Sequence, residues 1–371
     1  MNSAIRAAAL AASVASAFAG SAFAANVTLY GRVDTGVIVN RSFGDSASRG
    51  TVVSMNSGVN TASRWGLKGT EKLSDDTDVL FQLENRFTSD DGSFKTFSSG
   101  KAGRMFGGQA FAGVKSKTFG QVTFGRNAGS SSGSGAYDLQ YYMDAFGGGT
   151  NGTGNAPVKA GRYDNTVTWR TPMLQGFQGT FMYSMKGDGY DEGDENTSDV
   201  NRYWSAALRY AKGPMNLVAI AEGTAWGHAK QIDQGASTSR KLFTVGGSYR
   251  FQPVTVYAQA QYWNGANRID GFKADPSSSI EGWGLYAGTQ FWMSGLSSWQ
   301  SMVYYKDYSL NKAGASFDGK SIGVATKYLY RPSKTIDMYV GGGFSQWDRV
   351  SGGRILTDKN LNAFLGLTKY F

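Results

Sequence analysis

The last eleven residues of the chain, 361–371, alternate apolar and polar side chains and end on an aromatic residue, Phe371. Successive side chains of a β-strand point to opposite faces, so Leu361 and Leu365 share one face while Thr368 lies on the other. One face suits lipid and the other suits water. Taken alone, this segment fits the last strand of a soluble β-sandwich equally well, so the rest of the chain must decide.

The first 24 residues have the three parts of a secretory signal peptide. Arg6 supplies positive charge, residues 7–20 are apolar but too few to span a bilayer, and a small-x-small cleavage pattern ends at Ala24. We therefore expect export, with residues 1–24 removed. Taking Arg6 from the 37 Lys and Arg leaves 36, which against 28 Asp and Glu gives a mature charge of +8.

Composition points to strands rather than helices in residues 25–371. The chain has 51 Gly, 22 Phe and 20 Tyr but only 6 Pro, and no mature stretch approaches about twenty consecutive apolar residues. With no Cys, neither disulfides nor thiolate metal sites are expected. No linker or charge block divides the mature chain, so we expect one domain.

Alternating strand patterns recur along the whole mature chain. In residues 27–40, for example, Val27 and Val33 share one face while Arg32 and Asp34 share the other. An even number of such strands, joined as a meander and closed on itself, leaves no backbone group unpaired against lipid. The sequence therefore predicts an all-β, up-and-down antiparallel transmembrane barrel of about sixteen strands. The predicted strands are 27–40, 63–72, 79–87, 109–115, 121–124, 162–170, 177–184, 203–210, 215–222, 241–249, 254–263, 283–292, 299–306, 321–330, 336–344 and 361–371.

Short turns and long polar loops alternate between these strands, which is typical of outer-membrane barrels. The longest connection, 127–161, is rich in Gly, Ser and Asn but carries an aromatic and acidic centre at 136–144. Long insertions of this kind are disordered or functional, and the aromatic centre favours function. The other long polar loops are predicted at 186–200, 223–240, 264–280, 307–318 and 345–359.

Several motifs, in order along the chain, resemble the trimeric general-diffusion porins of Gram-negative outer membranes. The branch of this family that the motifs resemble is the one whose mature chain opens with Val-Thr-Leu-Tyr-Gly and ends on Phe. Gly108 stands where that branch usually has arginine, so the details of pore charge are not inherited. The matching segments are 27–31, 63–71, 81–84, 106–114, 119–127, 164–167, 171–172, 176–177 and Phe371.

The resemblance implies a water-filled channel for passive diffusion of small hydrophilic solutes and ions, narrowed by a third loop folded into the lumen. Residues 127–161 match that loop in position. Opposed charges at such a constriction bias which ions enter, and the number of wall cations favours a weak preference for anions. Asp34 and Glu84 are candidate lumen partners of wall arginines. The candidate constriction residues are Arg32, Arg64, Lys68 and Arg86 on the inward parity, Arg126 if its strand bends, and Asp138 and Asp144 in the loop.

The resemblance also implies a multi-pass outer-membrane location and assembly as a homotrimer. The expected surroundings are outer-membrane lipids, including lipopolysaccharide. A terminal Phe on such a strand is, by resemblance, the signal for the outer-membrane insertion machinery, a role that falls to Phe371. No cofactor is expected.

Other functions remain as alternatives. A substrate-specific channel would use inward aromatics such as Tyr257 and Trp263 as a stacking track. Residues 129–133 match a GxSxG pattern, but no strand-turn-helix context surrounds them and His228 lies far along the chain, so no enzyme is predicted. Acidic residues of loop 186–200 fit no EF-hand spacing, so no metal site is predicted. Dispersed basic residues argue against nucleic-acid binding.

Overall fold

The computed structural model describes residues 26–45, 50–94, 104–147, 158–187, 193–228, 239–270, 272–274, 278–312, 315–351 and 353–371. The predicted signal peptide lies outside these ranges. In them, no helical stretch has the length and apolar character needed to cross a membrane. They include a short 3-10 helix, η1 (Gln140–Tyr142).

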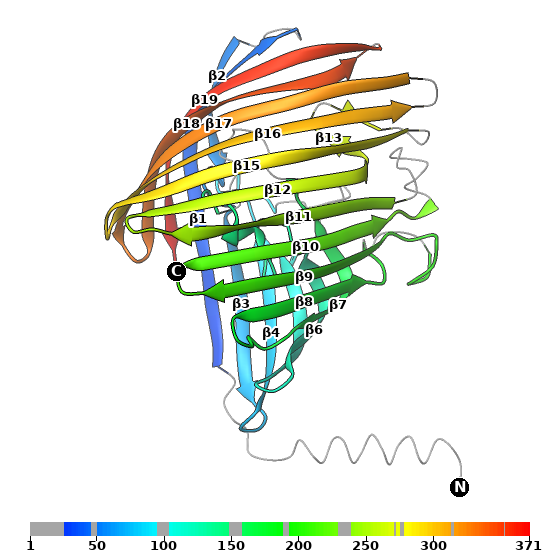
Figure 1. Ribbon diagram of the computed structural model, residues 1–371. Coiled ribbons are helices and arrows are strands. Elements are labelled where there is room, and N and C mark those ends of the chain that lie inside the picture. Colours follow the sequence, from blue (N-terminus) through cyan, green and yellow to red (C-terminus); the bar gives the residue numbers. More distant parts are fainter. Residues whose placement is uncertain are drawn as a thin grey trace.

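Antiparallel strands form one closed wall (Figure 1). Neighbours in sequence pair with one another around the circle, with β12 pairing to β15 across a small separate hairpin, β13 (Arg268–Ile269) and β14 (Phe272–Lys273). The predicted up-and-down barrel is confirmed. The strands of the wall are β1 (Asn26–Gly44), β2 (Gly50–Ser57), β3 (Arg64–Lys72), β4 (Thr77–Arg86), β5 (Gln109–Ser116), β6 (Gly120–Ala128), β7 (Arg162–Arg170), β8 (Phe177–Ser184), β9 (Arg202–Lys212), β10 (Met215–Ala225), β11 (Ser239–Arg250), β12 (Val254–Ala266), β15 (Ser278–Ser294), β16 (Ser297–Lys312), β17 (Ala315–Ser333), β18 (Ile336–Ser351) and β19 (Arg354–Tyr370).

The circle closes where the last strand pairs with the first. β1 and β19 run antiparallel from Arg32 opposite Tyr370 to Gly44 opposite Asp358. Beyond the end of β19, Phe371 exchanges two backbone hydrogen bonds with Gly31, at 2.9 and 3.1 Å. The outward face of β19 is the predicted apolar one. The C-terminal alternation therefore belongs to a barrel seam rather than to a sandwich.

Strand β2 is not predicted from the sequence. Its position explains how seventeen strands form a sixteen-stranded wall. β1 pairs with β3 over its first part and with β2 over its second part. β2 and β3 thus occupy successive lengths of one edge of β1. The residues between them, 58–63, turn into the barrel, and we call them the inner segment.

The inner segment accounts for an aromatic side chain that the alternation leaves unexplained. Phe364 lies on the water-facing parity of β19 yet is almost completely buried. Val59 of the inner segment packs over it, so the side chain is shielded from water inside the lumen. The cluster consists of Ile38, Val59, Leu329, Tyr339 and Phe364.

The prediction of long loops at 307–318 and 345–359 is wrong, because most of these residues belong to strands. In the first range, β16 continues to Lys312 and β17 begins at Ala315. In the second range, β18 continues to Ser351 and β19 begins at Arg354. Polar side chains face water on both sides of a strand that extends beyond the membrane. The apolar alternation that marks a strand in the sequence therefore fades there, although the pairing continues.

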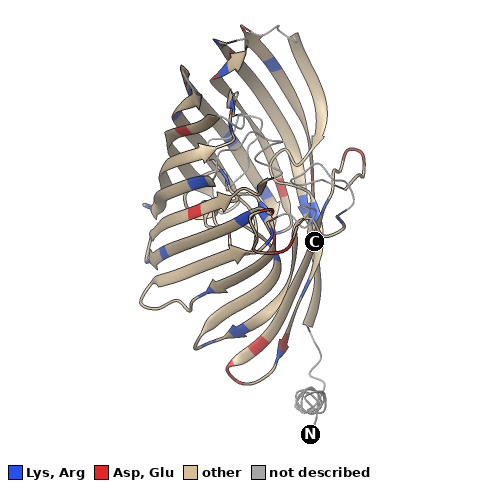
Figure 2. Cartoon of the chain, turned by 90° about the vertical axis from the view of Figure 1, so that its right-hand side faces the viewer, with Lys and Arg blue, Asp and Glu red and all other residues tan. Residues whose placement is uncertain are grey.

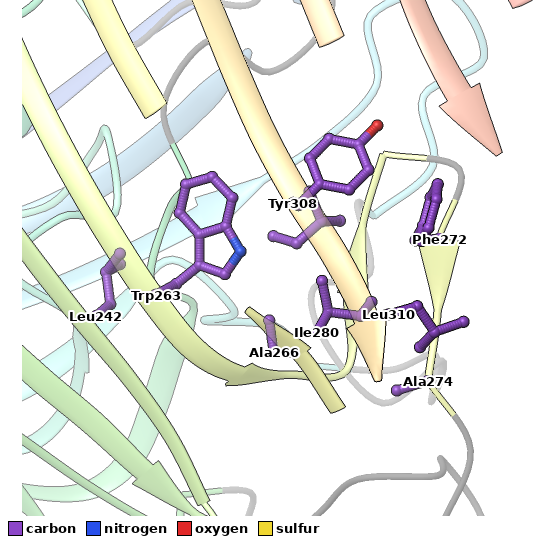
Figure 3. Packing of buried hydrophobic residues seen from close by; sticks show 9 residues of the cluster. Leu242, Trp263, Ala266, Phe272, Ala274, Ile280, Tyr308 and Leu310 are labelled. Atoms are coloured by element: carbon purple, nitrogen blue, oxygen red, sulfur yellow. The ribbon is translucent and has the colours of Figure 1, made fainter. Parts of the chain in front are cut away.

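An apolar cluster lies inside the barrel near these extended strands (Figure 3). Hairpin β13–β14, in the predicted loop 264–280, folds so that Ile269 and Phe272 pack on wall residues. Val158 from the 127–161 connection packs against the same group. We call it the mouth cluster, and its buried members are Leu242, Trp263, Ala266, Ile269, Phe272, Ala274, Ile280, Tyr308 and Leu310.

Candidate functional site

The connection between β6 and β7 enters the lumen, as predicted. We call its described residues, 129–147 and 158–161, the inserted loop. Near its start Ser131 donates a hydrogen bond to Glu222 on β10, and Tyr137 is buried with its hydroxyl 2.7 Å from Thr123 on β6. These contacts fix the near side of the loop to the wall.

The far end of the inserted loop reaches the long strands. Ala145 and Phe146 pack in a cluster with Tyr286, Met302 and Tyr304. Asp144 accepts a hydrogen bond from the Tyr286 hydroxyl at 2.7 Å. The loop therefore crosses the lumen and is anchored on both sides, which leaves the passage between the loop and the arginine-bearing strands.

That passage is a cavity of about 670 Å³, which we call the constriction cavity. Among the described residues, its charged lining consists of six cationic side chains and one carboxyl group. The cations come from β1, β3, β4, β7 and the inserted loop. They are Arg32, Arg64, Arg86, Lys159, Arg162 and Arg170, and the carboxyl group is that of Asp138.

The arginines are held by specific acceptors. Arg64 and Arg86 both bind Glu84, at 3.0 and 3.3 Å, and Glu84 is almost completely buried behind them. The Nε groups of Arg32 and Arg64 both donate to the carbonyl oxygen of Ala62 in the inner segment, at 3.2 and 3.4 Å. Two like charges therefore share one acceptor. The prediction that Glu84 partners wall arginines agrees with this geometry.

Arg126 points into the barrel because β6 contains a bulge. The register of β6 against β7 shifts between Gly125 and Asn127, and Gly125 has φ 133°, a backbone conformation that other residues rarely adopt. The extra residue turns Arg126 inward, where it forms an ion pair with Asp164 and donates to the Gly107 carbonyl. Arg126 is thus lumenal but is not part of the lining of the constriction cavity.

Three other predicted site residues lie apart from the cavity lining. Lys68 is exposed on β3 with its amine 5.3 Å from the centre of the Tyr30 ring. Asp144 is buried at the anchored end of the loop. Asp34 accepts hydrogen bonds from the Tyr339 hydroxyl at 3.0 Å, from Thr368 and from the Asn60 backbone, rather than from an arginine.

Asp138 is the carboxyl group that faces the cations. Its Oδ1 accepts backbone hydrogen bonds from Gly133 at 2.8 Å and Gln140 at 3.2 Å. Burial nevertheless dominates and raises the pKa of Asp138 to about 6. Burial also lowers the pKa of the Lys159 amine, while Asp144 and Asp138 favour its charged form.

The sequence prediction missed Lys159, Arg162, Arg170 and the inner segment. Arg170 carried a usable signal, because it shares parity with the buried Thr166 and Thr168 of β7. Arg162 lies at the end of that strand, where parity is less informative. Lys159 and the inner segment belong to irregular stretches with no local pattern that indicates the lumen.

The structure also places the residues of the alternative functions. Trp263 is fully buried in the mouth cluster, so Tyr257 and Trp263 do not form an exposed stacking track. Ser131 donates to Glu222, whereas His228 contacts Asp199, so serine and histidine are not paired. Basic side chains are spread over many strands (Figure 2).

No three His, Asp or Glu side chains gather as metal ligands in the described ranges. Three acidic residues of loop 186–200 lie outside those ranges: Asp188, Asp191 and Glu192.

Comparison with known proteins gives a consistent result. Residues 8–349 match the model of a family described as Gram-negative porin. An outer membrane porin protein of Bordetella pertussis is 34% identical over 267 residues, covering 66% of each chain. Outer membrane porin protein 32 of Delftia acidovorans is 33% identical over 246 residues, covering 63% of each. The matched region thus spans slightly less than two thirds of these relatives' lengths.

Solved structures share the fold. An anion-selective porin from Comamonas acidovorans superposes with a TM-score of 0.68, covering 94% of this chain and 100% of that one at 21% identity. OmpT of Vibrio cholerae, expressed in the outer membrane, gives a TM-score of 0.62 at 14% identity, with 95% and 99% covered.

Proposed function

We propose that this chain, which belongs to the Gram-negative porin family, forms a water-filled channel through which small hydrophilic solutes and ions diffuse passively, with a weak preference for anions. The observation that carries the proposal is the constriction cavity, whose described lining has six cationic side chains against one carboxyl group. Counted in unit charges, six minus one leaves +5. Including Glu84 behind Arg64 and Arg86 lowers the sum to +4.

The mechanism needs no chemical step on the solute. Fixed charges beside a narrow aqueous passage, with low-dielectric walls around it, raise the local concentration of ions of opposite sign. Anions therefore enter more often than cations of the same size. The preference remains weak because salt screens charges beyond about 8 Å at physiological ionic strength.

The Comamonas neighbour, which shares the fold, is described as anion-selective, and this supports the sign of the proposed preference. The homotrimer is also part of the proposal, supported by the trimer form described for Vibrio cholerae OmpT. A cleaved signal peptide at 1–24, contact with lipopolysaccharide and recognition of Phe371 by the insertion machinery complete the proposal.

Reversal potentials in planar bilayers test the channel and its selectivity. The purified protein is inserted into a neutral bilayer under a tenfold gradient of potassium chloride, and single-channel steps are recorded. We expect conductance steps and a reversal potential of the sign set by chloride. A clearly cation-selective channel would contradict the anion preference, and the absence of any conductance would contradict the channel itself.

A further inference from the structure

One buried amine touches both elements that narrow the lumen. Lys327 on β17 is almost completely buried, and its Nζ donates to Asn60 Oδ1 of the inner segment at 2.7 Å. The same Nζ lies 4.9 Å from the centre of the Phe146 ring at the anchored end of the inserted loop, a cation–π distance. Lys327 therefore joins two chain segments that are far apart in the sequence.

The inner segment in turn holds two of the wall cations. Its Ala62 carbonyl is the shared acceptor of Arg32 and Arg64. Guanidinium groups repel each other, and the shared Ala62 oxygen offsets that repulsion together with Glu84, which binds Arg64. Ala62 follows Asn60 by two residues, which makes the Lys327 contact with Asn60 a means of setting where both charges lie.

The backbone of the inner segment has a separate anchor. The Gly58 N–H donates to the Asp34 carbonyl at 2.9 Å, and the Asn60 N–H donates to the Asp34 carboxylate at 3.2 Å. This anchor fixes one side of the segment to β1. The side chain of Asn60 points to the other side and meets Lys327, so losing that contact loosens the segment without detaching it.

We propose that Lys327 is a positioning residue of the pore, which sets the placement of Arg32 and Arg64 through Asn60 and thereby tunes ion selectivity. This inference rests on the proposed function, because it concerns the permeability ratio of the same channel. It assigns a role to a residue whose own side chain is not part of the lining of the constriction cavity.

The test compares variants of the full-length protein by reversal potential and single-channel conductance. Asn60→Ala is the decisive variant, because it removes the acceptor of Lys327 while keeping every charge of the pore. We expect its ratio of anion to cation permeability to fall by about twofold. Lys327→Met should lower the ratio at least as much, and Asn60→Ala should change little when added to Lys327→Met, because both act on one contact.

Lys320→Met is the matched control, since it removes the same charge from an exposed position of the same strand. It should leave the permeability ratio unchanged. An Asn60→Ala channel with the wild-type ratio would overturn the inference, because Lys327 would then act through its own charge alone. If Lys327→Met does not assemble, the Asn60→Ala comparison still decides.

The two proposals fail in different ways. A wild-type channel that prefers cations contradicts the proposed anion preference. The permeability ratio of Asn60→Ala can still be compared with that of the wild type in that case, so the inference about Lys327 is tested separately. An anion-preferring wild type with an unchanged Asn60→Ala variant contradicts only the inference about Lys327.

Discussion

Strands β3–β8 on one side of the barrel are 8–10 residues long, whereas β15–β19 on the other side are 16–19 residues long. A tilted transmembrane strand needs about 9–11 residues, so the short side does little more than span the membrane and the long side extends well beyond it. In Figure 1 the long strands, coloured yellow to red, run across the upper part of the wall.

The two sides also carry different chemistry. Four of the six cations of the constriction cavity, Arg64, Arg86, Arg162 and Arg170, come from the short strands. The long strands β15–β17 supply the tyrosines and apolar groups on which the end of the inserted loop packs, and β15 and β16 supply Ile280, Tyr308 and Leu310 of the mouth cluster. A loop is anchored best where contacts are dry, and a cation keeps its charge most easily where water and acceptors reach it. This barrel therefore gathers most cations of the passage on its short side and the apolar anchor of the loop's far end on its long side.

The largest effect is expected from a change at the seam between β1 and β19, where the two sides of the barrel meet. Deleting Phe371 removes its two backbone hydrogen bonds with Gly31, worth about 2 kcal/mol together, as well as the proposed insertion signal. We expect the yield of folded, heat-modifiable protein in outer-membrane fractions to fall by about thirtyfold, since each 1.4 kcal/mol of the roughly 2 kcal/mol corresponds to a factor of ten. Phe371→Tyr keeps the ring and the backbone and serves as the control. Normal yield after the deletion would refute the prediction.

The second largest effect is expected from removing cationic charges that the short strands contribute to the constriction cavity. The double variant Arg64→Gln and Arg162→Gln removes two charges from the cavity lining, and we expect the ratio of anion to cation permeability to fall by about fivefold at low salt. Reversal potentials measure it. Lys212→Gln with Lys320→Gln removes two exposed charges outside the lining and should change the ratio little. Equal effects of the two pairs would show that net charge, rather than the cavity, sets selectivity.

The inserted loop should respond to pH. Because the pKa of Asp138 is raised to about 6, its carboxyl group is mainly charged at pH 7 and mainly neutral at pH 5. Protonation adds one positive unit to the cavity, so anion preference should rise by about 1.5-fold as pH falls over this range. Asp138→Asn should show the higher preference already at pH 7 and no pH response between 5 and 7. A response that survives in this variant would assign the titration to another group.

The smallest effect is expected for Lys68→Gln. Lys68 shares the inward parity of Arg64 on β3 but lies outside the cavity lining, where solvent screens it. We expect a change in the permeability ratio of less than about 20%, measured beside the single variant Arg64→Gln. A change as large as that of Arg64→Gln would extend the selective region along the whole short side.

Local alternation was enough to predict the closed barrel and every strand of its wall except β2. A strand in a membrane wall must present apolar side chains to lipid at every second position, so the period of two is written in the sequence wherever the strand lies in the membrane. Parity also brought Arg32, Arg64 and Arg86 to the lumen side, since each lies in a regular part of its strand. The extended ends of β16–β19 escaped prediction because both of their faces meet water.

Tertiary structure decided what the inward charges do. The bulge at Gly125 turned Arg126 inward against its parity, and the partners of Asp34 proved to be hydroxyl and backbone groups instead of an arginine. Lys159 and the inner segment entered the site from irregular stretches. Such placements depend on contacts between residues far apart in the chain, and a single amine, Lys327, meets residues 60 and 146 only after the barrel closes. The sequence alone therefore determines the wall and the sign of its charge, whereas the folded chain determines which charges face the passage.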